Sequence, residues 1–328
     1  MILFDNESTS AAFWFAAEEY ILKVLRPDEP VLMLWNTDDT IMIGANQIAE
    51  AECDTTYARS SEIEVVRRSS GGGAIFTDRG TLQYTVILPC VEGDDPALTV
   101  RAWLAEPIIA ALGRYGVSAS LEGRNDVVIE GKKISGMAQY IREGYVCSHC
   151  SLLFSTDLEK LTRSLSVDRE KFKTKAIAST RARVANISDH IDEKDLQSFR
   201  NALITSATQK VSSRAGFSEA ESAAIAEIMR EKYLNPEWTY GREPAFTFTN
   251  AKRFPGGRIE AFLDVKGGII KEARISGDFL SLLPVAELEE KLKGVPHRAD
   301  ALTETLKTID VQACLGSLGA PELLEVLL

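Results

Sequence analysis

The chain has 328 residues, 45% hydrophobic and 26% charged, with a formal net charge of −11. These values are ordinary for a globular protein of one or two domains, and the acidic balance argues against a nucleic-acid partner. No apolar run reaches the roughly 18 residues of a membrane span, and we find no secretory signal. Five scattered cysteines indicate reduced thiols. We expect a cytoplasmic protein without nucleic-acid or membrane partners.

The first half of the chain predicts a helix followed by short strands and further helices. An amphipathic pattern over 8–25 places its apolar residues at helical spacing, namely Phe13, Ala16, Ala17, Tyr20, Ile21, Val24 and Leu25. Buried strands are predicted at 31–35, 40–44, 62–68 and 81–88. The last two flank a glycine-rich loop as in a β-hairpin. A helix is predicted over 96–115, and strands joined by short turns at 125–130, 132–140 and 145–154.

The second half predicts two helices, a linker and a small α+β unit. The helices are expected near 193–210 and 219–233, the second with a capping box from Ser218 to Glu221. A linker rich in turn-formers at 235–244 precedes three strands and several helices. The fold class expected is α+β, with a mixed, largely antiparallel sheet and flanking helices. We expect a catalytic domain over 1–240 and an accessory domain over 245–328.

A triple glycine, Gly71 to Gly73, directly follows Arg67 and Arg68. Three glycines weaken a strand, but they permit positive φ and let a ligand approach backbone amides. Arginine binds phosphate or carboxylate through its planar guanidinium, so the expected ligand is an anion. The alternative is a bulged hairpin with a solvated arginine pair. Neither the P-loop nor the dinucleotide-binding glycine signature is present, so any nucleotide site belongs to another fold.

Two further stretches carry charge in a pattern that suits phosphate. Asn125 and Asp126 lie on one predicted strand, Lys132 and Lys133 begin the next, and Gly136 permits close approach. A lysine there offers a point charge, and a carboxylate offers a metal ligand or a hydroxyl acceptor. The stretch 168–183 has a local net charge of about +4 in an acidic chain. Taken separately, Asp126 and the two lysines are better explained as surface charges, and the alternative for 168–183 is a solvated loop.

Together these motifs resemble the lipoate–protein ligase family in its two-domain bacterial form. The matching pieces span the whole chain and comprise "RRSSGGGA" (67–74), Asn125-Asp126, "KISGMA" (133–138), His149, Lys175 with "RARVANI" (181–187), and "GREPAF" (241–246) with "GGRIEAFLDVKGG" (256–268). The resemblance implies the biotin and lipoyl ligase fold, which is related to class II aminoacyl-tRNA synthetases.

The resemblance also implies a role for individual residues. The nucleotide-binding positions are Arg68, Gly71, Gly72, Gly73, Ala74, Ile75, Phe76, Asn125, Asp126, Lys133 and Lys175. Lys133 is the implied catalytic residue, placed between the acyl carboxylate and the α-phosphate. The implied lipoate-binding residues are Trp35, Arg68, Lys133 and His149. Asp126 is the implied ligand of Mg²⁺.

The implied reaction joins lipoate to a protein in two steps. ATP and Mg²⁺ activate lipoate, or octanoate, to an acyl-AMP, and the acyl group then passes to a lysine of a lipoyl domain. Such domains belong to E2 subunits of 2-oxoacid dehydrogenases and to the glycine cleavage H protein. We expect a monomer. Ala45, Thr77, Met137 and Cys150 depart from residues that are frequent in the family, which affects the lipoate contacts more than the adenylation step.

Three alternatives follow from other features. Cys147 or Cys150 could carry an acyl thioester, as in related ATP-independent octanoyl and lipoyl transferases. A zinc site would need Cys147, His149 and Cys150 to converge, which a regular strand prevents because Cys150 points to the opposite face. A lipoate- or biotin-binding regulator would need a DNA-binding module, for which no pattern is found. Packing of buried thiols is the favoured explanation of both cysteines.

Overall fold

The structure is a computed structural model that describes residues 1–90, 95, 101–123, 125–165, 182–240 and 247–328. Its chain forms two compact units. The first unit comprises 1–42, 53–66 and 75–235, and the second comprises 43–52, 67–74 and 236–328. Within the described ranges, none of the helices has both the length and the apolarity needed to cross a bilayer. The predicted division into 1–240 and 245–328 stays a prediction.

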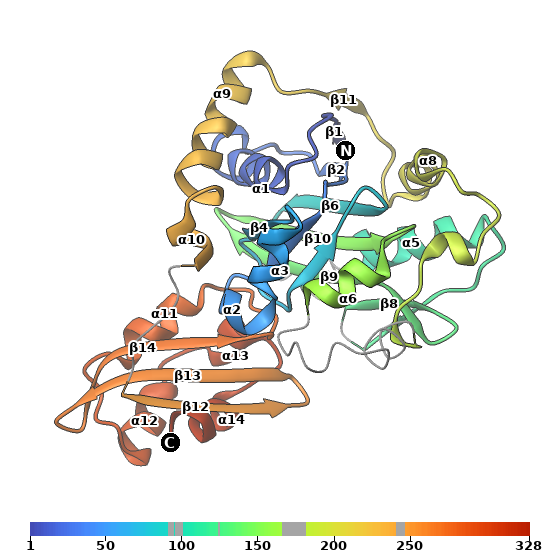
Figure 1. The fold of residues 1–328 in the computed structure, drawn as a ribbon. Helices are drawn as coiled ribbons and strands as arrows, with labels where there is room; N and C mark the ends of the chain where they lie inside the picture. Colours follow the sequence, from blue (N-terminus) through green and yellow to red (C-terminus); the bar gives the residue numbers. More distant parts are fainter. Residues whose placement is uncertain (91–94, 96–100, 124, 166–181, 241–246) are drawn as a thin grey trace. The chain divides into compact units, whose positions relative to one another are not determined.

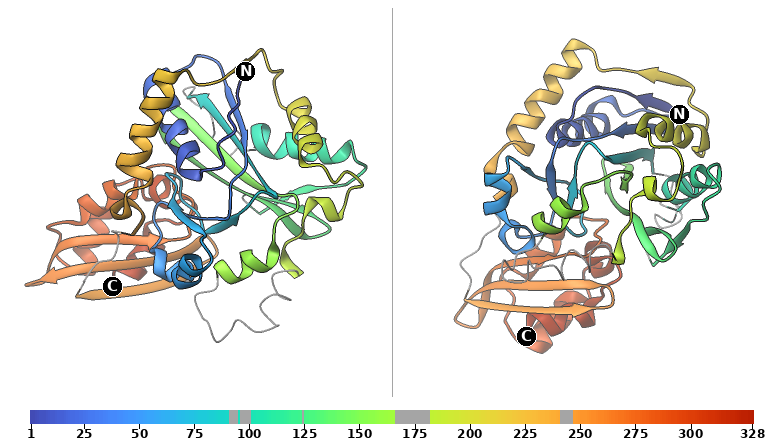
Figure 2. Two further views of the ribbon diagram at one scale, coloured as in Figure 1. Left: turned by 45° about the horizontal axis from the view of Figure 1, so that its top comes forward. Right: turned by 45° about the vertical axis from the view of Figure 1, so that its right-hand side comes forward.

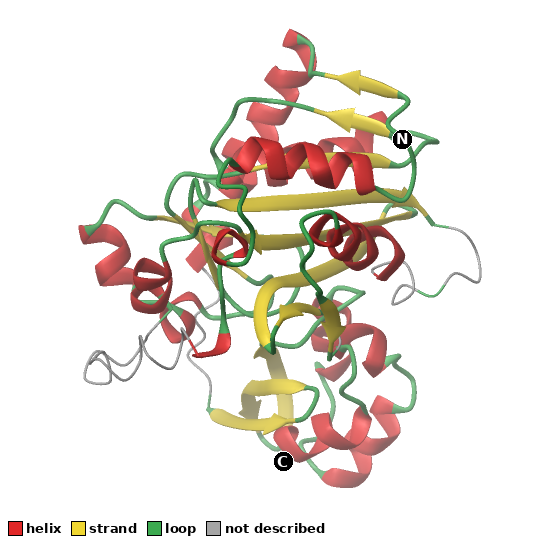
Figure 3. Cartoon of the chain, turned by 90° about the vertical axis from the view of Figure 1, so that its right-hand side faces the viewer, coloured by secondary structure: helices red, strands yellow, loops and turns green. Residues whose placement is uncertain are grey.

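The first unit is built on an eight-stranded sheet (Figures 1 and 3). In spatial order, its strands are β11 (Ser213–Ala215), β1 (Ile2–Phe4), β2 (Val31–Trp35), β6 (Thr81–Pro89), β10 (Tyr145–Leu153), β9 (Lys132–Arg142), β8 (Asp126–Ile129) and β7 (Ser120–Glu122). Only β1 pairs in parallel, with β2 and β11, and the other pairs are antiparallel. The sheet is therefore mixed and largely antiparallel, as predicted.

Helices cover both faces of this sheet. Successive side chains of a strand point to opposite faces, so Tyr84 and Cys150 join one core with α5 (Glu106–Gly113) and α8 (Leu196–Ser206). The opposite face is covered by α1 (Ala11–Tyr20), which continues as a π-helical turn over Ile21–Leu25. Figure 2 shows α9 (Glu219–Ile228) beside α1, and the two helices are in contact. Short helices α2 (Ala49–Glu52), α3 (Thr55–Ser60) and α6 (Leu158–Ser164) complete the N-terminal half.

The strands on either side of the glycine loop do not form the predicted hairpin. β4 (Glu64–Arg67) pairs with β3 (Thr40–Ile43) in a separate three-stranded sheet, together with β5 (Ile75–Thr77). β6 instead pairs with β2 and β10 in the large sheet. The hairpin prediction is wrong because it considered only neighbours in sequence, whereas the longer apolar strands pair across the core.

The second unit has a core of its own. β12 (Phe248–Phe254), β13 (Gly257–Lys266) and β14 (Ile269–Gly277) form an antiparallel sheet. Its apolar face packs against helices, namely α11 (Val285–Leu292), α12 (Ala299–Leu306), α13 (Val311–Leu315) and α14 (Ala320–Leu327). A short helix, α10 (Pro236–Tyr240), lies in the predicted linker. The predicted strands and C-terminal helices are confirmed.

The helix predictions hold with one correction, at Val24. The capping box at Ser218 is present, and α9 continues as a π-helical turn to Tyr233. On the first helix, Val24 was assigned to the apolar face but is 58% exposed, because the π-helical turn there departs from the 3.6-residue period on which the assignment rests. The predicted start of the helix at 96–115 lies outside the described residues.

Candidate active site

A β-bulge turns Lys133 toward the carboxylate of Asp126. Asp126 pairs in register with Gly136, but the register shifts between Val127 and Val128, so that Val128 lies opposite Lys133. Bulges re-aim side chains in this way. The Lys133 Nζ then lies 2.8 Å from Asp126 Oδ1. A Cβ added at Gly136 would lie 2.9 Å from the Lys133 Nζ, so the lysine end would have to shift from this position. The predicted close approach at Gly136 is thus made by the lysine itself.

The ammonium of Lys133 opens onto a cavity of about 460 Å³. The cavity is also lined by Asp126 and by Arg183, the last residue of the predicted basic stretch. The neighbouring Asn125 is fixed to β9, because its side-chain amide donates to the Met137 carbonyl oxygen at 2.8 Å. Glu122 lines the cavity as well, so two cationic groups and two carboxylates meet there, and the two cations are the groups that could contact an anion such as phosphate.

The register places Lys133 on the same sheet face as the predicted lipoate-binding residues. Residues that lie opposite each other in a ladder share a face. Following the ladders, one face carries Trp35, Thr85, His149, Gly136 and Asp126. The bulge adds the lysine to this face. Residues far apart in sequence therefore line one surface, from a charged cavity at one end to aromatic side chains at the other.

The aromatic end of this face is enclosed by α1. Trp14 of α1 stacks on Trp35 with ring centroids 5.6 Å apart, and Phe15 lies 6.4 Å from His149. The Trp35 indole donates to the Thr85 hydroxyl at 3.3 Å. Both Trp35 and His149 are buried. Apolar rings with a few fixed polar groups suit an aliphatic ligand that ends in a small polar head.

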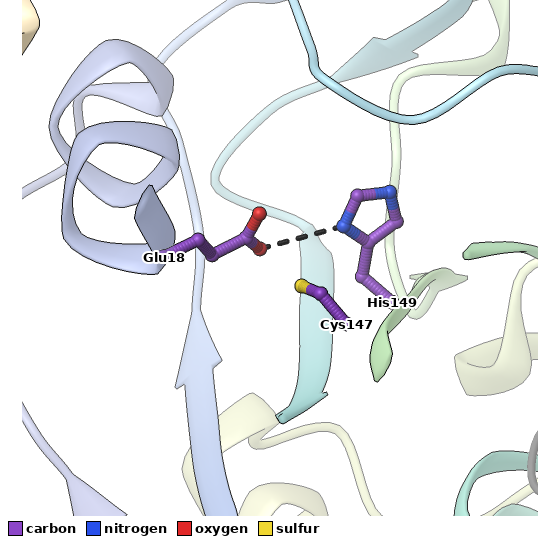
Figure 4. Close-up of side chains that lie close together, drawn as sticks. All are labelled: Glu18, Cys147 and His149. Atoms are coloured by element: carbon purple, nitrogen blue, oxygen red, sulfur yellow. Dashed lines mark hydrogen bonds and ion pairs between the residues drawn. The ribbon is translucent and has the colours of Figure 1, made fainter. Parts of the chain in front are cut away.

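Glu18 is a residue of this region that sequence reasoning missed. It projects from α1 toward Cys147 and His149, as Figure 4 shows, and its Oε1 accepts from the Thr85 hydroxyl at 3.1 Å. Glu18 is 1% exposed. Its position on the helix could have indicated burial, because it directly follows two of the apolar residues, Ala16 and Ala17. Sequence reasoning did not use this signal, because a glutamate is ordinarily exposed to solvent.

The two cysteines of β10 lie on opposite faces of the sheet, as predicted. Cys150 packs in the core beneath α5, whereas Cys147 faces α1. Burial raises the pKa of the Cys147 thiol well above its usual range, and the nearby Glu18 raises it further. Burial raises the pKa of Cys150 to about 12. Both thiols are therefore protonated at neutral pH, which disfavours a cysteine nucleophile.

Arg67 is a structural residue rather than a solvated one. Its guanidinium is fully buried. Nη1 donates to the carbonyl oxygens of Gly44 and Gln47 at 2.8 and 2.5 Å. Nη2 donates to Thr239 at 2.6 Å, and Nε donates to Trp238 at 2.9 Å. Arg67 thus joins three stretches of the second unit and is committed to carbonyl groups, so the solvated arginine pair considered above is wrong.

Arg68 shapes the glycine loop from within. Its Nη2 donates to the carbonyl oxygens of Gly71 and Gly73 at 2.7 and 2.8 Å, and its Nε donates to the Ser70 hydroxyl at 3.0 Å. Burial lowers the pKa of Arg68 to about 10, so it remains charged at neutral pH. These hydrogen bonds fix the loop around a buried positive charge.

The three glycines of the loop have different neighbours. A Cβ at Gly71 would lie 2.8 Å from the Ser281 Oγ and 2.9 Å from the Phe279 carbonyl oxygen. Gly72 has a φ of +91°, and its N–H donates to the same carbonyl at 2.9 Å. A Cβ at Gly73 would meet no atom within 4 Å. Packing within the second unit explains the first two glycines, and nothing in the described chain requires the third.

The structure groups the predicted site residues by unit. Lys133, Asp126, Asn125, Trp35 and His149 belong to the first unit. Ile75 and Phe76 belong to it as well, in β5. The remaining loop residues belong to the second unit, namely Arg68, Gly71, Gly72, Gly73 and Ala74. Lys175 lies outside the described residues.

Solved structures share this fold. A structure of P. falciparum LipL1 in complex with lipoate covers 94% of this chain and 94% of that one, with a TM-score of 0.78 and 22% identity. A lipoate-protein ligase A bound with ATP is 29% identical over 73% of this chain and 98% of its own, with a TM-score of 0.64. The predicted fold class is confirmed.

Sequence comparison gives the family. A model described as lipoyl protein ligase A/B catalytic domain matches residues 10–208, and one described as bacterial lipoate protein ligase C-terminus matches residues 243–327. The lipoate-protein ligase LplJ of Bacillus subtilis is 34% identical, with 100% of both chains covered. The chain belongs to the lipoate–protein ligase family, and the resemblance seen in its motifs is confirmed.

Proposed function

We propose that this chain is an ATP-dependent ligase that activates lipoate to lipoyl-AMP and transfers the lipoyl group to a lysine of a lipoyl domain. One observation carries the assignment of the site: the bulge between β8 and β9 turns Lys133 onto the sheet face that also carries Trp35 and His149. A carboxylate with an apolar tail would then lie with its charged end at Lys133 and its tail along the rings.

In the first half-reaction, a lipoate oxygen attacks the α-phosphorus of ATP and pyrophosphate leaves. Attack brings negative charges together, so fixed cations lower the barrier. Lys133 stands at the cavity with Arg183, and we assign the stabilisation of the developing charge to Lys133. The loop amides, with Arg68 as their internal cation, are proposed to bind the nucleotide phosphate.

Mg²⁺ is part of the proposal, with Asp126 as its protein ligand. Sites of this kind hold Mg²⁺ through one or two carboxylates and the substrate phosphates, and Asp126 lines the cavity. One carboxylate oxygen pairs with Lys133, so the second oxygen is the one available to the ion. Mg²⁺ would neutralise phosphate charge when bound.

In the second half-reaction, a lysine amine of the acceptor attacks the acyl carbonyl. The C–N bond forms, the C–O bond to AMP breaks, and the amine loses a proton to solvent. Holding amine and mixed anhydride together supplies much of the rate. The proposal has four further parts. The preferred acid is lipoate or octanoate, and the acceptor is the lipoyl domain of an E2 subunit or the H protein. The protein is a monomer and is located in the cytoplasm.

The test is transfer of a lipoyl group, followed by intact mass. The purified chain is mixed with ATP, Mg²⁺, lipoate and an apo lipoyl domain. Lys133→Ala should lower lipoyl-AMP formation by about 10²–10³-fold, the usual loss when one charge-stabilising group is removed. Lys132→Ala, one residue earlier on the same strand, is the matched control and should retain activity. Transfer that is equally fast without ATP would overturn the proposal, and so would full activity of the Lys133 variant.

A further inference from the structure

Three side chains that can each bind a metal ion converge beneath α1. Glu18 comes from the helix, and Cys147 and His149 come from alternate positions of β10, so they share one face of the strand (Figure 4). One ligand atom from each lies within 4.8 Å of the other two. The exposed fractions are 1%, 0% and 8%.

The spacing within the trio fits two ligands of one ion better than it fits a strong hydrogen bond. His149 Nδ1 lies 3.4 Å from Glu18 Oε1, whereas charge-assisted hydrogen bonds are about 2.7–2.9 Å long. Two nitrogen or oxygen ligands, each about 2.0–2.1 Å from a tetrahedral zinc ion, lie about 3.3 Å apart. The separation of 3.4 Å matches that value, and the Cys147 sulfur lies within 4.8 Å of both ligand atoms.

The charges around Glu18 also leave a place for a cation. Of the residues described, none of the lysines or arginines lies within ion-pair distance of this carboxylate, and the nitrogen nearest to it is His149 Nδ1 at 3.4 Å. The carboxylate is oriented by the Thr85 hydroxyl, which in turn accepts from the Trp35 indole. Outer hydrogen bonds of this kind fix the ligands of metal sites.

We propose that Glu18, Cys147 and His149 form a binding site for a divalent transition metal, with zinc as the ion it fits best. A thiolate, an imidazole and a carboxylate are zinc ligands, whereas Mg²⁺ and Ca²⁺ prefer oxygen alone. Three protein ligands leave a fourth position open. Binding replaces the thiol S–H bond by a metal–sulfur bond and releases the proton to solvent. The raised pKa of Cys147 describes the metal-free state, which a divalent cation would reverse.

Cobalt substitution tests the site without measuring ligation. The full chain is stripped with EDTA, dialysed and titrated with Co²⁺, which reports a thiolate ligand by its near-ultraviolet charge-transfer absorption. The wild type should bind about one equivalent with that absorption. Cys147→Ser should abolish it, and His149→Gln and Glu18→Gln should each weaken binding by about 10–100-fold, at least the loss seen when a supporting residue is removed. Cys150→Ser is the matched control on the opposite face and should behave as wild type.

A second measurement needs no variant. X-ray absorption of the zinc-loaded wild type should show one sulfur at about 2.3 Å, and nitrogen or oxygen ligands alone would overturn the proposal. A cobalt–thiolate absorption that survives Cys147→Ser, or a wild type that binds no equivalent, would overturn it as well. Circular dichroism verifies that each variant is folded. Because neither readout involves ATP or an acceptor, failure here leaves the proposed ligase activity untouched.

Discussion

Two neighbouring carboxylates on α1 are both buried, yet they are neutralised in different ways. Glu19 contacts Lys23 and Lys232, each at 2.6 Å, and accepts from the Tyr233 hydroxyl at 2.9 Å. Glu18 has a thiol, an imidazole and a hydroxyl as neighbours. Among the described residues, two lysines pair with Glu19, whereas none of the lysines or arginines lies within ion-pair distance of Glu18. We assign the carboxylate that has its own lysines to structure and the other to the proposed metal site.

The glycine loop repeats this contrast on the backbone. Gly71 and Gly72 are fixed by the Phe279 carbonyl and the Ser281 side chain, whereas Gly73 faces open space. The same residue type thus performs two tasks at adjacent positions. On α1 we assign Glu18 to a ligand, and in the glycine loop we assign Gly73 to one, because no contact within the described residues accounts for either residue type.

Removing the Glu19 carboxylate should have the largest effect on stability. Glu19→Ala leaves Lys232 and Lys23 without their shared partner, and breaking a buried ion pair costs about 3–5 kcal/mol. The free energy of unfolding, from urea denaturation at neutral pH, measures the loss. Glu18→Gln in metal-free protein is the contrast and should cost at most about 1 kcal/mol, because the amide oxygen still accepts from Thr85. Equal losses of unfolding free energy in the two variants would contradict the proposed difference between Glu18 and Glu19.

Lowering the pH should reduce the free energy of unfolding through protonation of Glu19, and this is the next largest expected effect. Burial would by itself raise the pKa of Glu19, but Lys232, Lys23 and Arg142 outweigh burial and lower the pKa to about 2. Since the folded state favours the ionised form, the stabilisation is complete above the ordinary glutamate pKa and is lost as the pH falls toward 2. The difference amounts to about 3 kcal/mol.

This contribution is measured as the unfolding free energy of wild type between about pH 6 and pH 3. Glu19→Gln should flatten the dependence over that interval. An unchanged slope in the variant would contradict the assignment to Glu19.

Alanine substitutions in the glycine loop should separate stability from activity. Gly71→Ala places a methyl group against the Phe279–Ser281 backbone, and overpacking of this kind costs about 1–3 kcal/mol. Gly73→Ala should change stability by less than about 0.5 kcal/mol and should impair lipoyl-AMP formation, because the methyl group would occupy the ligand's space. Thermal unfolding and pyrophosphate release measure the two effects. Full activity of Gly73→Ala would contradict its assignment to the nucleotide.

Local pattern was sufficient to predict much of the fold. Strands such as Val31–Trp35 and Tyr145–Leu153 are apolar runs bounded by turns, and their bounds agree with the prediction to within one residue. The side of the sheet on which Lys133 emerges could not be predicted, because it depends on a register shift against β8. The burial of Arg67 depends on acceptors about 20 and 170 residues away. The direction of Lys133 and the burial of Arg67 both depend on pairing between residues that are distant in sequence. The periodicity of apolar residues does not predict such pairing.

The buried guanidinium of Arg67 has a consequence for anyone who wishes to shorten this protein. Two of its acceptors, Trp238 and Thr239, lie beyond residue 235, and the Trp238 indole donates back to the Arg67 carbonyl at 2.9 Å. A polypeptide ending at 235 would keep the arginine and lose those carbonyls, directly beside the glycines. Residues 236–328 therefore cannot be removed without a structural cost. Their removal would leave the Arg67 guanidinium without two of its acceptors, next to the glycine loop.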